Sequence, residues 1–300
     1  RHTRSCLKSR GLGDVYKRQT PAHTHKFVAR DLAAHLVSGQ ILLLHPGRTG
    51  GALEVRHVLN AEQCPADVLV MEAQTLLYAA RKEGSAVNLF GLKQQVSCAG
   101  LPGHKSQRFF DLMQPMIPQF VPAPTIWHTS LHNIGMLFHP APTLLNLGRM
   151  ESGPSYEYYS EGFSPSIAAL IEKLDTERLA VAAAMGLTLP TVVEWLASSY
   201  GVVAQTLYEA MQLAENDKGI GAPRLASLEA KKGLRYVTED VPTGLVPVSE
   251  LGKKFGVKTP AIDTIINLAD ILFDTDFRAT GRNLDQLGLR NLSPEEIIAL

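Results

Sequence analysis

The chain has 300 residues, of which 45% are hydrophobic, and its 29 basic and 29 acidic residues cancel at pH 7. This apolar share is sufficient for a sizeable core and excludes an intrinsically disordered protein, and the length fits two domains. Because the chain has no net positive charge, its composition also argues against nucleic acid as the main partner.

Cysteine usage and hydropathy indicate where the protein works. Cys6, Cys64 and Cys98 have neither the spacing of a metal site nor that of a disulfide framework. Such a sparse, odd set is typical of a reducing compartment. No apolar run approaches the roughly 20 residues that a membrane-spanning helix requires. We therefore expect a cytoplasmic protein with no metal site and no membrane partner.

Residues 1–19 differ in character from the rest of the chain. They are strongly basic, show no amphipathic period and lack the apolar core of a signal peptide. They resemble translated adapter sequence at the end of a metagenomic fragment, although a genuine basic arm has a similar composition. We expect a non-native leader here and leave it out of the predicted fold.

Residues 20–125 alternate between helical patterns and short apolar strands. Helices are expected at 25–40, 52–63 and 103–120. Strands are expected at 41–44, at 68–71 and once or twice within 85–102. The segment 76–84 is expected to form a helix or a turn. Apolar strands that alternate with helices predict an α/β doubly wound sheet that is covered on both faces.

Three polar loops of this region fall at one edge of the predicted sheet. They are residues 20–22, 46–51 and 72–75. Ligands of such sheets bind beyond the carboxyl ends of the strands, which is where these loops fall. Arg48, Thr49 and Thr75 offer polar groups there, although each alone could equally be a solvated loop residue. Together the three loops predict a ligand site.

No catalytic or nucleotide fingerprint accompanies these loops. No Gly-x-Gly-x-x-Gly opens a helix after a strand, and no Walker loop, HExxH, GxSxG or CxxC occurs in the sequence. The Gly-Leu-Gly of residues 11–13 lies in the suspected leader and follows no strand. Motifs alone therefore assign no cofactor.

Residues 126–300 predict almost nothing but helices. The first long helix begins at Ser164-Pro165 and ends at Gly186, and a second is interrupted near Gly201. The stretch 233–247, RYVTEDVPTGLVP with its flanks, is expected to be irregular between two or three later helices. This pattern predicts a separate all-helical domain.

The junction between the two patterns carries a candidate proton-transfer group. The segment 131–146 contains His132 and Asn133 and reaches a His-Pro step at His139. Pockets favour domain interfaces, and imidazole changes its charge near neutral pH, which suits a general acid or base. The alternative is a histidine at a helix start that has no chemical role.

Arg235 and Asp240 lie close together in the predicted irregular stretch. The guanidinium fork of an arginine suits a carboxylate ligand, and a carboxylate can fix the tautomer of a histidine. An ordinary surface ion pair is the alternative. Tyr156, Tyr158 and Tyr159 are further candidates for a pocket lining, or for half-packed rings.

Six blocks of the sequence resemble, in order, the octopine/nopaline (opine) dehydrogenase family. The blocks are TPAHTH, QILLLHPGRTGG, MEAQTLLYAAR, HNIGMLFHPAPTLLN, RYVTEDVPTGLVPVSELGKKFGV and TPAIDTIINLA, and they extend over nearly all of residues 20–300. That family reductively condenses a 2-oxo acid with the amino group of an amino acid, using NADH or NADPH. The resemblance implies that residues 20–125 are the C-terminal part of a Rossmann-type NAD(P)-binding domain. Residues 126–300 would form an all-helical catalytic domain like the C-terminal domain of 6-phosphogluconate dehydrogenase.

The resemblance also implies a role for each candidate residue. His139 matches the catalytic acid/base, Asp240 the carboxylate paired with it, and Arg235 the arginine that binds the carboxylate of the 2-oxo acid. The other substrate contacts that it implies are Thr75, Arg48, Thr49 and Asn133, with His132 a weaker match. The contacts implied near the nicotinamide of NAD or NADP are Thr20, Pro21 and Ala22.

One departure from the family concerns the front of the cofactor domain. The family's glycine fingerprint, first strand and cofactor-selecting acidic residue would all precede Thr20. At roughly 30 residues per βαβ unit, two or more units would lie outside this chain. We therefore expect that this chain by itself binds the dinucleotide poorly, exposes sheet edges and is inactive.

Two other functions fit the same pattern. One is a reductase of the ketopantoate-reductase or hydroxyacid-dehydrogenase kind, which would use the nucleotide and the histidine but need no amino acid. The other is a non-catalytic helical module that binds a partner or dimerises. The joint presence of His139, Arg235 and Asp240 favours the enzyme.

Overall fold

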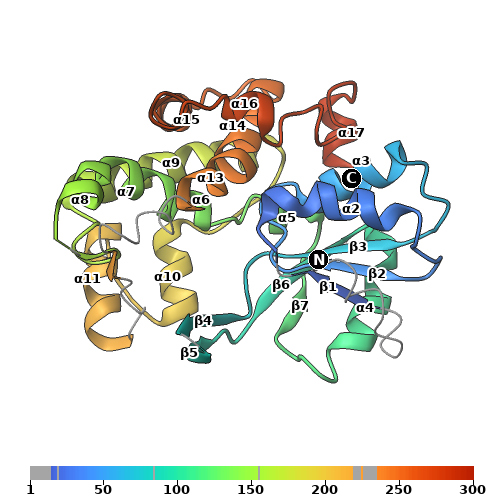
Figure 1. The fold of residues 1–300 in the computed structure, drawn as a ribbon, viewed down its shortest axis with the longest axis horizontal. Coiled ribbons are helices and arrows are strands. Elements are labelled where there is room, and N and C mark those ends of the chain that lie inside the picture. Colours follow the sequence, from blue (N-terminus) through green and yellow to red (C-terminus); the bar gives the residue numbers. More distant parts are fainter. Residues whose placement is uncertain (1–14, 19, 84, 155, 219–223, 226–234) are drawn as a thin grey trace.

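The computed structural model describes residues 15–18, 20–83, 85–154, 156–218, 224–225 and 235–300. These residues form two halves that lie side by side, a sheet flanked by helices and an almost entirely helical part (Figure 1). Within the described ranges, no helix combines the length and the apolar character needed to cross a bilayer.

A five-stranded sheet in the order β1-β2-β3-β6-β7 forms the first half. Its strands are β1 Val15–Arg18, β2 Ile41–Leu44, β3 Leu69–Ala73, β6 Val96–Leu101 and β7 Phe120–Pro122. β1, β2 and β3 are parallel, as are β6 and β7, but β6 runs antiparallel to β3. The α/β pattern is thus confirmed, with one reversal. It arises because β3 and β6 are joined through a hairpin and not through the crossover helix that parallel neighbours usually need.

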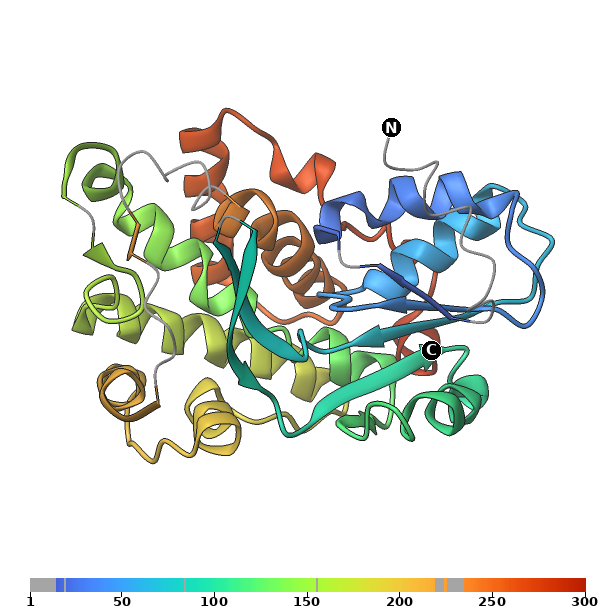
Figure 2. The same ribbon diagram turned by 60° about the horizontal axis from the view of Figure 1, so that its bottom comes forward.

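That hairpin consists of β4 Tyr78–Glu83 and β5 Ala86–Leu92, which pair antiparallel and project from the sheet beside the helical half (Figure 2). The expected helix or turn at 76–84 is therefore wrong. Alanine, arginine and lysine are good helix formers, but here pairing with β5 overrides their local preference.

The strand β1 lies inside the range that the sequence assigns to a leader. Residues 15–18 pair in parallel with β2, from Val15 opposite Ile41 to Arg18 opposite Leu44. These four residues therefore belong to the sheet, while residues 1–14 and 19 lie outside the described part of the chain.

Helices cover both faces of the sheet, which explains why its strands are apolar throughout. Leu42 and Leu44 of β2 share a core with α2 His25–Ala33 and α3 Gly51–Ala61. Ile41 and Leu43 point to the opposite face and pack with α4 Ser106–Met113. The strand β2 thus divides its side chains between two cores with the two-residue period of a strand.

The second half is built from short and long helices. They are α5 Ile126–Ser130, α6 Gly135–Phe138, α7 Pro140–Leu145, α8 Leu147–Ser152, α9 Pro165–Ala184, α10 Val192–Tyr200, α11 Leu207–Lys218, α13 Arg235–Thr238, α14 Val246–Lys254, α15 Pro260–Phe273, α16 Phe277–Thr280 and α17 Pro294–Ile298. Two short strands, β8 Tyr156–Glu157 and β9 Arg224–Leu225, pair beside them.

The predicted helix boundaries in this half have clear local causes. Ser164 caps α9 by accepting a hydrogen bond from the Ile167 N–H, and Gly186 follows its end with φ +75°. Gly201, with φ +70°, separates α10 from α11. Both positive angles suit glycine, which has no Cβ to clash with the backbone.

The described part of the stretch 233–247 is helical, which corrects the expected irregular segment. Between α13 and α14 lies a π-helix, η4, over Val241–Leu245. Pro242 stands near its start, where a missing N–H is tolerated. A Cβ at Gly244 would lie 2.5 Å from Cβ of Met136, so this glycine lets η4 approach α6 closely. The proline and the glycine thus shape a close contact between helices instead of breaking them.

A buried arginine in the C-terminal segment joins the two halves. Arg282 is 1% exposed, and its Nε donates to Glu54 Oε2 at 3.0 Å. Its other nitrogens donate to three backbone carbonyls, those of Gly47, Thr49 and Ala22. The guanidinium therefore fixes the two loops that the sequence predicts at the ligand-binding edge.

Replacing this arginine tests its structural role. In Arg282→Ala, Glu54 and the carbonyls would stay buried without their donor, and we expect the free energy of unfolding to fall by about 3–5 kcal/mol. Urea denaturation measures this loss. Arg290→Ala is the control, because Arg290 and Asp285 form an ion pair in which both side chains are more than half exposed. Equal losses for the two variants would contradict the role of Arg282.

Candidate active site

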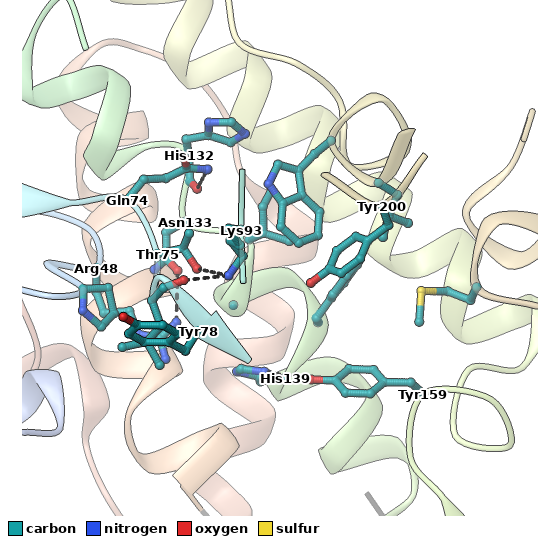
Figure 3. A pocket seen from close by; sticks show the side chains of 18 residues that line it. Arg48, Gln74, Thr75, Tyr78, Lys93, His132, Asn133, His139, Tyr159 and Tyr200 are labelled. Carbon is teal, nitrogen blue, oxygen red and sulfur yellow. Dashed lines mark hydrogen bonds between the residues drawn. The ribbon is translucent and has the colours of Figure 1, made fainter. Parts of the chain in front are cut away.

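A cavity of about 260 Å³ lies between the sheet and the helices (Figure 3). The loops that follow β2 and β3 line one side of it with Pro46, Arg48, Gln74 and Thr75. The segment that leads into α6 and the end of α6 line another side with His132, Asn133, Gly135, Phe138 and His139. The sheet edge that the sequence predicts as a ligand site and the predicted junction between the two domains thus meet at one cavity.

His139 and Asp240 form a close pair at this cavity. Nδ1 of His139 lies 2.7 Å from Oδ2 of Asp240, although the two residues are 101 positions apart. Asp240 is buried, whereas His139 keeps 16% of its side chain exposed and lines the cavity. With Asp240 ionised, Nδ1 is the donor, so Nε2 is left to exchange a proton with a ligand.

Arg48 holds the other oxygen of the same carboxylate. Its Nη1 lies 3.2 Å from Oδ1 of Asp240, and its Nε lies 3.7 Å from Oε1 of Glu239. Burial raises the pKa of Asp240, but the charges of Arg48 and His139 outweigh burial and bring it below its usual value. Gly135 makes room for this contact, because a Cβ there would overlap Nη1 of Arg48 and lie 3.0 Å from Oδ1 of Asp240. Asp240 is therefore kept as a carboxylate.

Two tyrosines fix the ring of His139. Tyr236 stacks on it, with ring centroids 4.1 Å apart and planes at 10°. The hydroxyl of Tyr159 lies 3.3 Å from Nε2. Burial raises the pKa of Tyr159 well above its usual value, so its hydroxyl stays protonated. Of the three candidate tyrosines, Tyr159 lines the cavity, while Tyr156 and Tyr158 are buried outside the lining.

Arg235 lies away from the cavity lining. Its Nη2 is 2.9 Å from Oε2 of Glu239, and 61% of its side chain is exposed. Glu239 in turn accepts a hydrogen bond from the Ala22 N–H at 3.1 Å. In this structure Arg235 therefore helps to hold Glu239 and, through it, the loop at Ala22.

The remaining predicted substrate contacts divide into two groups. Thr75 and Asn133 line the cavity, and Oδ1 of Asn133 accepts a hydrogen bond from Arg48 at 3.4 Å. Thr49 is fully buried behind them and accepts from Nδ2 of Asn133, so it positions the amide. His132 lines the cavity as a neutral ring, because burial lowers its pKa to about 3.

The loop of Thr20, Pro21 and Ala22 is fixed at the carboxyl end of β1, next to Glu239 and Arg282. Oγ1 of Thr20 is buried and has no hydrogen-bond partner among the described residues. An unsatisfied buried hydroxyl at the carboxyl edge of a parallel sheet fits contact with a bound group. The hydroxyl of Thr20 is therefore available to a ligand at this edge.

Several residues at the site escape prediction from the sequence. In the sequence, only its position next to Asp240 points to Glu239 as a site residue. Only its position between Arg235 and Asp240 points to Tyr236. Lys93, after β5, and the aromatic wall of Trp195 and Tyr200 line the cavity from distant segments. Only the paths of the hairpin and of α10 bring these three side chains to the site.

Comparisons of the sequence and of the fold with known proteins match this chain to the same group of proteins. The family described as NAD/NADP octopine/nopaline dehydrogenase, alpha-helical domain, matches residues 122–273. An opine dehydrogenase of Arthrobacter sp. (strain 1C) is 41% identical over 281 residues, which cover 93% of this chain and 76% of the relative. A vitopine synthase of Allorhizobium ampelinum (strain ATCC BAA-846 / DSM 112012 / S4) is 27% identical, covering 93% and 75%.

Two solved structures share the fold. Octopine dehydrogenase with NADH and L-arginine superposes with a TM-score of 0.74 at 21% identity, covering 95% of this chain and 78% of that one. Yersinopine dehydrogenase without ligand has a TM-score of 0.67 at 15% identity, covering 98% and 79%. This likeness confirms a Rossmann-like domain followed by an all-helical domain.

The charge on Asp240 gives a testable pH dependence. Its lowered pKa means that the carboxylate stabilises the fold above about pH 4, the usual value, and that this stability is lost as the pH falls through the lowered pKa. In Arg48→Met the pKa of Asp240 should rise, so acid unfolding should begin at higher pH. Circular dichroism during acid titration measures the midpoint. Arg30→Met, which removes an exposed ion pair with Glu62, should leave it unchanged.

Proposed function

The chain belongs to the octopine/nopaline (opine) dehydrogenase family of NAD(P)-dependent oxidoreductases, and on that premise we propose that its cavity reductively condenses a 2-oxo acid with the amino group of an amino acid. We assign residues 15–18 and 20–125, which build the sheet half, to the cofactor domain and residues 126–300 to the catalytic domain. The cytoplasm is the proposed location, which the free thiols of Cys64 and Cys98 support.

One observation carries the proposal: a histidine lines the cavity while its far nitrogen is held by a buried carboxylate. Attack of the amine on the ketone carbon gives a carbinolamine. This intermediate forms an imine when its hydroxyl group is protonated and leaves as water. His139 in its protonated form donates the proton from Nε2 to that leaving hydroxyl. Asp240 stabilises the charged imidazolium at this stage, and Arg48 keeps Asp240 ionised.

The cofactor end of the reaction needs a nicotinamide near the imine carbon. Thr20, Pro21 and Ala22 would hold the nicotinamide end of NADH or NADPH, which supplies the hydride when bound. Glu239 and Arg282 keep this loop in place through the Ala22 N–H and carbonyl. The protein's part in this step is to place the substrates against the cofactor and to exclude water.

The lining of the cavity supports a neutral, apolar amino acid as the amine donor. Its far wall is aromatic and aliphatic, and consists of Phe138, Trp195, Leu196, Tyr200 and Met211. None of the described residues that line the cavity is acidic, so a cationic side chain would lack a partner. A hydrophobic side chain would instead bury its surface against this wall.

Oxidation of NAD(P)H, followed by absorbance with pyruvate and a panel of amino acids, tests the proposal. The assay uses the complete reading frame of the gene, because this chain spans 76% of the length of the opine dehydrogenase that it resembles. Activity should require both substrates, be higher with apolar than with basic amino acids, and fall at least about a hundredfold in His139→Ala. His104→Ala, an exposed histidine of a 3₁₀ turn, is the control and should keep full activity.

The other outcomes separate the alternatives. Oxidation by the oxo acid alone would place the protein with the simple reductases. An unchanged rate in His139→Ala would remove this histidine from the mechanism. Failure with every substrate pair, despite cofactor binding, would contradict the proposed reaction.

A further inference from the structure

Lys93 reaches the cavity from the segment that follows β5 (Figure 3). Its Nζ donates to the Leu76 carbonyl at 2.8 Å and to Oγ1 of Thr75 at 3.1 Å. An ammonium group has three N–H donors, so these contacts leave one free. The backbone N–H of Lys93 also donates to the Leu77 carbonyl, which fixes the stem of the side chain. The ammonium is therefore held in place with one donor available to a ligand.

The charge of Lys93 has no counter-charge in the described part of the chain. No ion pair to Lys93 occurs among the described side chains, and none of the described residues that line the cavity is acidic. Burial and the nearby charge of Arg48 lower the pKa of Lys93 to about 8. A partly buried cation in this position is costly unless a ligand supplies the opposite charge.

The two arginines near the cavity are already engaged. Arg48 contacts Asp240 and Glu239 and donates to Asn133. Arg235 pairs with Glu239 outside the lining. Among the described residues that line the cavity, Lys93 is therefore the cation whose charge no carboxylate balances.

We infer that Lys93 binds a carboxylate of the substrates and so determines which anions the cavity accepts. The role rests on the proposed function, in which both the 2-oxo acid and the amino acid carry a carboxylate. Thr75 and the Leu76 carbonyl orient the ammonium, and the bound carboxylate completes its hydrogen bonds. The same charge would repel an amino acid with a cationic side chain.

The other titratable groups that line the cavity are two histidines and three tyrosines. His132 is neutral, and burial raises the pKa of both Tyr159 and Tyr200. Tyr78 and His139 complete the set of titratable lining groups. Because a bound carboxylate favours the ammonium form, carboxylate binding should weaken as the pH rises through about 8.

Steady-state kinetics of three variants test this role. In Lys93→Met, KM for one of the two substrates should rise at least about tenfold with a smaller change in kcat, because the lost contact exists before the reaction. Lys93→Arg keeps the charge and should restore much of the loss. Lys258→Met, an exposed lysine far along the chain, is the control. The substrate whose KM rises identifies the bound carboxylate.

A binding measurement separates this role from the proposed reaction. Calorimetry with oxalate, an unreactive dicarboxylate, should show binding to the wild type that weakens on going from below to above pH 8, and about tenfold weaker binding to Lys93→Met below pH 8. If this binding result is obtained but no catalysis is seen, it would support carboxylate binding by Lys93 and contradict the proposed reaction. Catalysis with unchanged KM values and equal oxalate binding, or no binding to either protein, would overturn the role of Lys93. If Lys93→Met fails to fold in a thermal melt, Lys93→Gln takes its place.

Discussion

A single buried carboxylate, that of Asp240, is shared between a histidine and an arginine, and the site depends on it. One oxygen holds His139 and the other faces Arg48. Without this acid, His139 would lose the acceptor that fixes its tautomer, and Arg48 would keep only Glu239 and Asn133 as polar partners. The arginine comes from the sheet half, and the histidine and the acid come from the helical half. The carboxylate of Asp240 therefore joins the carboxyl edge of the sheet to His139.

The cavity assigns different tasks to different segments. In the proposed reaction, proton transfer lies with His139 at the end of α6 and Asp240 just before η4, anion binding with the segment between β5 and β6, and the fit to the amino-acid side chain with α10 and α11. Among the described residues, no hydrogen bond joins the side chains of Trp195 and Tyr200 to the His139–Asp240 pair. Substrate range can therefore change through the wall while the acid and base remain in place.

Much of this arrangement could be read from the sequence, for physical reasons. The apolar run at 41–44 predicts a strand covered on both faces, and the structure buries all four of its residues. The family resemblance implies a pair of His139 and Asp240, and the structure places Nδ1 of His139 2.7 Å from Oδ2 of Asp240. The contact of Arg235 could not be predicted, because it depends on the short helix α13, which brings Glu239, just after its end, next to Arg235. The hairpin could not be predicted from the sequence, because its two strands stabilise each other. A local composition of alanine, lysine and arginine does not indicate such pairing.

The π-helix of Val241–Leu245 makes chain length itself a constraint. A π-turn holds one more residue than the α-turn it replaces, so α13 and α14 do not lie in the phase that a regular helix would give them. If the same five residues were wound as an α-helix, one flanking helix would turn against the other by about 100°. Asp240 would then face away from His139 even if every side chain in the cavity were retained. The extra residue and the π winding thus compensate each other, so a substitution that favours α-helical winding here would separate Asp240 from His139 with every residue of the cavity unchanged.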